Sequence, residues 1–143
     1  MAEVPRVFAS KEFGLLGDRY GKGGGSWSRP GKLHRQVSLI AQEAIQQANS
    51  GLTDPFLPGQ TRRNIVVSGI DPEGFNGLVD KTVLVGKAKL LISKLCEPCE
   101  RPARLAGKPD GESFKRAFAN MGGLCAQVVD DGLIEIGDSV SIF

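Results

Sequence analysis

The residues with the clearest chemical potential are two cysteines three positions apart, Cys96 and Cys99. A cysteine thiolate can attack sulfur, carry a persulfide or bind a soft metal ion. Lys94, Arg101 and Arg104 are close in sequence and favour the thiolate over the thiol, although two glutamates in the same segment oppose them. We predict that the sulfur of Cys99 is the functional atom. Cys96 is expected either to be packed against the protein or to act as a resolving thiol.

The segment before these cysteines predicts how they are positioned. Residues 87–92 are apolar and alternate in the manner of a β-strand, so this strand delivers the pair to its end. Pro98 and Pro102 interrupt both a sheet ladder and a helix. We therefore expect both cysteines on a stiffened loop that follows the strand.

Two other kinds of cysteine site are alternatives to this interpretation. A structural zinc site needs four ligands, and outside the loop only Cys125 and His34 could supply them. Cys125 lies in an alternating apolar segment and is predicted to belong to the core. A thioredoxin-like dithiol needs a helix that starts at the motif, which Pro102 disfavours. A disulfide between the two loop cysteines remains an outcome of oxidation.

The composition indicates an ordinary globular chain. Its 143 residues fit one domain, residues 1–143, and 41% of them are hydrophobic while 24% are charged. A net charge of +2 makes no case for nucleic acid. Three cysteines, no secretory start and no apolar stretch of membrane-spanning length predict a cytoplasmic protein with free thiols and no membrane partner.

The pattern of apolar residues predicts about seven short strands and two helices. We expect helices at residues 36–49 and 113–121, a hairpin over residues 124–136, and strands at residues 7–9, 65–68 and 87–92. A glycine-rich stretch at residues 21–31 reads as a loop and lacks the Gly-Lys-Ser/Thr signature of a phosphate loop. Without βαβ alternation, this order predicts a mostly β (α+β) fold: a curved, largely antiparallel, barrel-like sheet with flanking helices.

A series of short motifs then suggests a family. The motifs are Gly14-Leu15-Leu16-Gly17-Asp18, Arg35-Gln36-Val37-Ser38, Arg62-Arg63-Asn64-Ile65, Leu95-Cys96-Glu97-Pro98-Cys99, Gly122-Gly123, and Gly132-Leu133-Ile134-Glu135-Ile136-Gly137-Asp138. Each motif alone is weak, but their order over nearly the whole chain resembles the MOSC domain, named from the C-terminal part of molybdenum cofactor sulfurases. The resemblance implies a β-barrel-like domain that works with the molybdenum cofactor.

The resemblance also implies roles for particular residues. Cys99 matches the family cysteine proposed to carry sulfur or to bind molybdenum. A pterin cofactor carries a phosphate, which guanidinium groups bind bidentately, so Arg35, Arg62 and Arg63 become candidates to hold molybdopterin. Asn64 offers a donor and an acceptor to the edge of a ring. The competing interpretation of each arginine is a solvated surface charge.

The family contains proteins with different activities, and these leave alternatives open. Members joined to a pyridoxal-phosphate desulfurase domain receive sulfur from it; this chain is too short to include that domain, so we expect a stand-alone member without pyridoxal phosphate. Its partner would be either a separate sulfur donor, such as a cysteine desulfurase, or an electron-transfer protein. The alternatives are a molybdenum-dependent reductase of N-hydroxylated compounds and a non-catalytic interaction domain.

Overall fold

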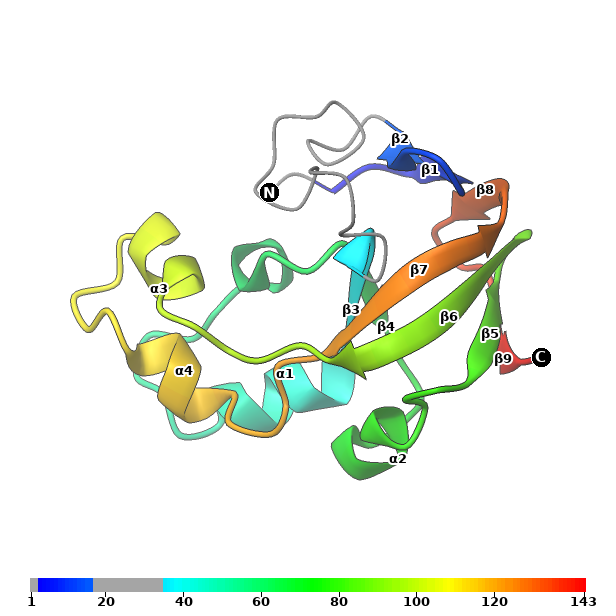
Figure 1. The fold of residues 1–143 in the computed structure, drawn as a ribbon. Helices are drawn as coiled ribbons and strands as arrows, with labels where there is room; N and C mark the ends of the chain where they lie inside the picture. Colours follow the sequence, from blue (N-terminus) through cyan, green and yellow to red (C-terminus); the bar gives the residue numbers. More distant parts are fainter. Residues whose placement is uncertain (1–2, 17–34) are drawn as a thin grey trace.

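The computed structural model describes residues 3–16 and 35–143, so the glycine-rich stretch at residues 21–31 and His34 lie outside the described residues (Figure 1). The described residues form β1 (Arg6–Ser10), β2 (Gly14–Leu16), β3 (Val37–Ala41), α1 (Gln42–Asn49), the 3-10 helix η2 (Pro58–Thr61), β4 (Ile65–Val67), α2 (Pro72–Asn76), β5 (Thr82–Val85), β6 (Ala88–Leu95), α3 (Arg101–Leu105), α4 (Ser113–Ala117), β7 (Leu124–Asp130), β8 (Gly132–Glu135) and β9 (Val140–Ile142). No helix in this part of the chain is long and apolar enough to cross a membrane.

The strands form two sheets. One has three strands in the order β2-β1-β8, and the other has six in the order β4-β3-β7-β6-β5-β9. Every strand pair is antiparallel except β3 with β4. The two longest strands, β6 and β7, run side by side and curve, with two shifts in their register (Figure 1). The predicted mostly β, curved and largely antiparallel fold is confirmed, and residues 87–92 lie in strand β6 as expected.

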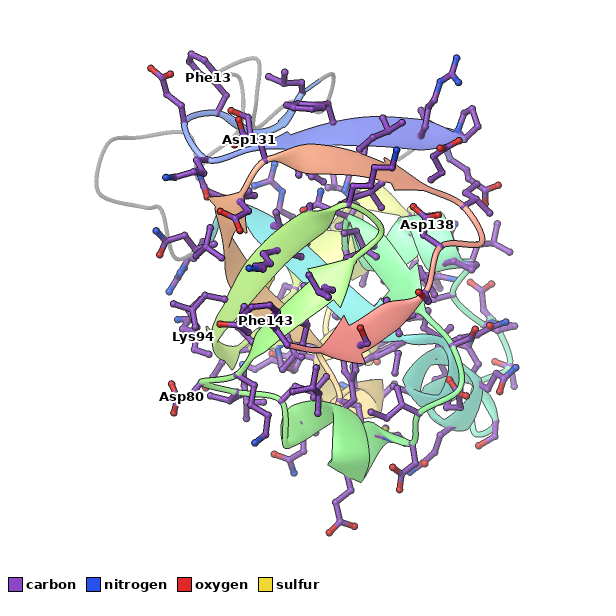
Figure 2. The ribbon with its side chains drawn as sticks, turned by 90° about the vertical axis from the view of Figure 1, so that its right-hand side faces the viewer. Phe13, Asp80, Lys94, Asp131, Asp138 and Phe143 are labelled. Carbon is purple, nitrogen blue, oxygen red and sulfur yellow. The ribbon has the colours of Figure 1, made fainter. Side chains whose placement is uncertain are left out.

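The predicted hairpin over residues 124–136 is wrong, although both of its strands exist. Strand β7 pairs with β3 and β6, whereas β8 pairs with β1 in the other sheet. The chain changes sheets at Asp131, whose carboxylate accepts a hydrogen bond from the backbone of Lys11 at 2.7 Å (Figure 2). Gly132 then passes so close to the Lys87 carbonyl that a Cβ would collide with it. An alternating pattern fits any antiparallel partner, so it could not select the correct one.

The predicted helix over residues 36–49 is only half correct. Its second half is α1, but its first half is strand β3, which lies between β4 and β7. Val37, Leu39, Ile40 and Ala41 are all buried, because both faces of this inner strand are covered. A run of apolar residues buried on both faces contains the same i, i+3 and i+4 positions as one helical face. The helix predicted over residues 113–121 is also shorter, ending as α4 at Ala117.

The helices α1, α3 and α4 gather at one end of the curved sheet, as Figure 1 shows. Three buried aromatic rings lie among them. Phe114 and Phe118 stack with their ring centres 4.2 Å apart, and Phe56 packs edge-on against both, at 5.3 and 5.9 Å. Pro102, predicted to interrupt any helix, instead lies in the first turn of α3, where its missing N–H is not needed. This end of the barrel carries the cysteine loop.

Candidate functional site

The loop after β6 is held against the segment that leads into β7. The Cys96 backbone N–H donates to the Gly123 carbonyl at 2.8 Å. A Cβ on Gly122 would collide with the Cys96 carbonyl and press on Pro98, and Gly123 has a φ of 101°. A Cβ on Gly123 would also meet the carbonyl of Leu39 in β3. The two glycines therefore let three segments of backbone approach one another, which fixes the position of the loop.

The structure pairs the cysteines differently from the sequence analysis. Cys99 is exposed, Cys96 is half-buried and Cys125 is buried. Lys94 of β6 lies opposite Cys125 of β7, and the Cys125 thiol forms a hydrogen bond with Cys96. Cys125 belongs to the core as predicted, but it also contacts the loop thiol, which sequence reasoning missed. The only signal for this contact would have been the register of β6 against β7.

The surroundings of Cys96 favour its ionised form. Together, these surroundings lower the pKa of the Cys96 thiol to about 6. The hydrogen bond from Cys125 lowers this pKa most, and the positive charges of Arg63, Lys94 and Arg35 lower it further, whereas burial raises it. The same hydrogen bond, together with burial, raises the pKa of Cys125 above its ordinary value. At neutral pH the pair therefore holds a thiolate at Cys96 and a protonated thiol at Cys125.

This arrangement predicts a pH profile for modification of Cys96. Because only the thiolate reacts, we expect the rate of Cys96 alkylation by iodoacetamide to rise through about pH 6 and to reach a plateau below pH 8. Peptide mapping by mass spectrometry after short exposures would follow Cys96 separately from Cys99. Lys94→Met should move the midpoint to higher pH, because it removes one of the cations. A midpoint near pH 9 in the wild type would contradict the assignment.

Arg63 is the most unusual polar side chain near these thiols. It is only 8% exposed, its Nε donates to the Gly122 carbonyl at 2.7 Å and its Nη1 to the Thr61 carbonyl at 3.3 Å. The guanidinium lies 5.6 Å from the centre of the Phe114 ring. Its Nη2 is buried without a hydrogen-bond partner in the described structure. A buried charged donor without an acceptor is costly, so this atom marks a place where an anion would be stabilised.

The other predicted ligand-binding residues have different positions. Arg35 lies near enough to Cys96 for its positive charge to lower the pKa of the thiol. Arg62 is not among the residues whose charge lowers this pKa. Arg62 follows η2 with a left-handed φ of 63°. The Asn64 side-chain oxygen accepts hydrogen bonds from the Ser38 backbone (2.8 Å) and hydroxyl (3.1 Å), which ties β4 to β3.

Two cavities adjoin these residues. The smaller, of about 270 Å³, is lined by Asn76, Leu95, Cys96, Glu97, Pro98, Lys115, Ala119, Asn120, Gly122 and Gly123. The larger, of about 820 Å³, opens between the edge strands β4 and β9, and Arg63 and Asn64 lie on its wall among mostly apolar side chains. Arg63 thus contacts the larger cavity while its charge acts on Cys96. Chemically, the arrangement can hold an anion and present a thiolate.

Comparisons with known proteins agree with this architecture. The model of the MOSC domain family matches residues 24–141. The solved structure of YuaD from Bacillus subtilis superposes with a TM-score of 0.76 at 19% identity, covering 97% of this chain and 85% of that one. YiiM from Geobacillus stearothermophilus gives 0.69 at 18% identity, covering 96% of this chain and 60% of that one.

YiiM from Escherichia coli is similar at the same level, with a TM-score of 0.69, 16% identity and coverage of 98% of this chain and 63% of its own. This chain therefore spans about three-fifths of the length of the two YiiM structures. At these identities the likeness concerns the fold, and no curated protein matches the sequence significantly. Because the family model covers residues 24–141, most of the chain, the chain belongs to the MOSC domain family.

Proposed function

We propose that this domain binds a molybdopterin-type ligand and uses Cys99, in the loop after β6, to carry sulfane sulfur or to ligate molybdenum. MOSC domains are linked to the molybdenum cofactor. The observation that carries the proposal is the buried Arg63 guanidinium, whose Nη2 has no hydrogen-bond partner among the described residues and whose charge acts on Cys96. An anionic cofactor would satisfy this donor beside a thiolate.

The residues present fit such a ligand. A buried guanidinium suits a phosphate, because charge-assisted hydrogen bonds to phosphate oxygens are strong. The charge of Arg35 also acts on Cys96, and Asn64 carries an amide of the kind that pairs with the edge of a ring. A soft thiolate is a suitable ligand for a transition metal. When bound, the cofactor would supply redox chemistry at its metal, while the protein residues bind it, neutralise its charge and exclude water.

Cys99 has the position that sulfur transfer from another molecule requires. Its side chain is exposed, so a sulfur donor can reach it. The Cys99 thiolate would attack the outer sulfur of a donor persulfide, the donor S–S bond would break, and the donor would leave as a thiolate. Cys99 would then hold the sulfur as a persulfide. The donor in this proposal is a protein or small molecule that carries a persulfide.

Protein purified from a host that makes the cofactor tests the proposal. We expect the wild type to retain molybdenum and pterin or cyanolysable sulfur, and Cys99→Ser to lose the metal or the sulfur while keeping its fold. Glu100→Gln is the matched control, because it alters the same loop and removes only the exposed ion pair with Arg104. Wild-type protein without molybdenum, pterin or cyanolysable sulfur, indistinguishable from Cys99→Ser, would overturn the proposal.

A further inference from the structure

We propose that Cys96 and Cys125 form a second sulfur site, in which Cys96 accepts sulfane sulfur from a small persulfide and Cys125 then releases it as hydrogen sulfide. This activity goes beyond the proposed function, because it requires neither molybdenum, a pterin nor Cys99. The site consists of two cysteines that lie 29 positions apart in the sequence and meet at adjoining ends of β6 and β7.

The backbone holds the two thiols together. Leu95 lies opposite Leu124 and Lys94 opposite Cys125, and the next residue, Cys96, is fixed by its hydrogen bond to the Gly123 carbonyl at 2.8 Å. The two side chains already share a hydrogen bond. A disulfide requires its two Cα atoms to lie within about 7 Å, a condition that side chains in hydrogen-bond contact on paired strands readily meet. The sulfur atoms can therefore react with each other without a rearrangement of the sheet.

The two cysteines have different environments, as a nucleophile and its resolving partner require. Cys96 is half-buried and faces the charges of Arg63, Lys94 and Arg35, whereas Cys125 is only 6% exposed and lies behind it in the core. The cations and the hydrogen bond lower the pKa of Cys96, and the same contact raises that of Cys125. Cys96 thus meets a reagent as the thiolate, while Cys125 keeps a proton to deliver.

The cavity beside Cys96 indicates the size and charge of the reagent. At about 270 Å³ it admits a small molecule and excludes a folded protein. Lys115 contributes a positive charge to its wall, and Asn76 and Asn120 contribute amide groups. Glu97 is the one carboxylate on this wall. A small persulfide, ionised at neutral pH and rich in polarisable sulfur, fits a cavity whose wall carries the Cys96 thiol, the ammonium of Lys115 and two amide groups.

The proposed reaction has two steps. In the first, the Cys96 thiolate attacks the outer sulfur of the persulfide; a new S–S bond forms, the S–S bond of the donor breaks, and the donor leaves as a thiolate. In the second, the Cys125 thiol passes its proton to the outer sulfur of the Cys96 persulfide, and the Cys125 thiolate so formed attacks the Sγ of Cys96. The bond between Sγ and the outer sulfur breaks, and the outer sulfur leaves with the proton as hydrosulfide. The two cysteines are oxidised to a disulfide, and the sulfane sulfur is reduced. A small-molecule thiol then reduces the disulfide.

The test uses the reduced full chain without cofactor, mixed anaerobically with cysteine persulfide. We expect about one equivalent of sulfide per chain in a single turnover, on the stoichiometry of thiol–disulfide exchange, and a Cys96–Cys125 crosslink in peptide maps. Cys125→Ser should instead accumulate a persulfide on Cys96 and release little sulfide, and Cys96→Ser should do neither. Cys125→Ala provides a second version of the resolving-thiol variant, and circular dichroism checks the fold of each.

Cys99→Ser separates this proposal from the proposed function. Sulfide release by this variant supports an independent Cys96–Cys125 pair, whatever happens to bound molybdenum or pterin. Loss of release in Cys99→Ser, or a wild-type crosslink between Cys96 and Cys99, would overturn the pairing and assign the chemistry to the loop cysteines alone. An absence of any crosslink and of sulfide from the wild type would overturn it as well.

Discussion

Replacing Arg63 with methionine is expected to reduce the molybdenum and pterin that copurify with the domain by about one to two orders of magnitude. Arg63 offers a buried Nη2 that the described protein residues leave without an acceptor. A charge-assisted hydrogen bond contributes about 1.5–3 kcal/mol, and each 1.4 kcal/mol is about tenfold in affinity. Retention after gel filtration, measured by metal analysis and pterin fluorescence, gives the effect. The variant also loses the hydrogen bonds to the Gly122 and Thr61 carbonyls, so circular dichroism is used to compare its fold with that of the wild type.

A second readout separates the role of Arg63 in binding from a role in folding. Because the Arg63 charge favours the Cys96 thiolate, Arg63→Met should also move the midpoint of Cys96 alkylation to higher pH. Arg62→Met is the matched comparison, since Arg62 is not among the charges that act on Cys96. Arg63→Lys keeps the positive charge but loses the planar guanidinium. Its alkylation midpoint should therefore be close to that of the wild type, whereas its cofactor retention should stay well below that of the wild type. Wild-type retention in Arg63→Met would rule out the guanidinium as a phosphate ligand.

Truncating Phe114 to alanine is expected to lower the free energy of unfolding by about 3–5 kcal/mol, the usual cost of removing a buried aromatic ring. Phe114 is fully buried, stacks on Phe118 at 4.2 Å and packs edge-on against Phe56 at 5.3 Å. Its ring also lies beneath the Arg63 guanidinium. This cluster joins α4 to the connection before η2, so the loss would affect the whole helical end. Urea unfolding followed by circular dichroism would measure it.

Two further variants show whether the loss comes from burial. Phe114→Leu keeps most of the volume and should cost clearly less than alanine. Phe143→Ala removes a ring that is 71% exposed and lies 3.6 Å from the Lys89 ammonium (Figure 2). Its cost should be at most about 1 kcal/mol, because an exposed cation–π contact contributes little. Equal losses at Phe114 and Phe143 would refute the proposed importance of the cluster.

Patterns in the sequence predicted the structure correctly where an element depends on residues close together in the chain. The alternation of residues 87–92 placed strand β6, and proline-rich residues after it placed both loop cysteines outside regular structure. The i, i+3 pattern located α1, but the predicted helix wrongly included strand β3. Because β3 is buried on both faces, its apolar residues occupy the same positions as those of one helical face. Hydrophobic periodicity reports which faces are buried, and it does not report what covers them.

The sequence by itself determined the family, the curved β architecture and the loop that carries Cys96 and Cys99. Only the tertiary structure decided that β8 leaves β7 for another sheet, that Arg63 is buried, and that Cys96 contacts Cys125. Those features depend on strand register and on backbone segments brought together at Gly122 and Gly123. Spacing along a chain specifies neighbours within one element, whereas charge and hydrogen bonding at a thiol depend on residues that only folding brings near.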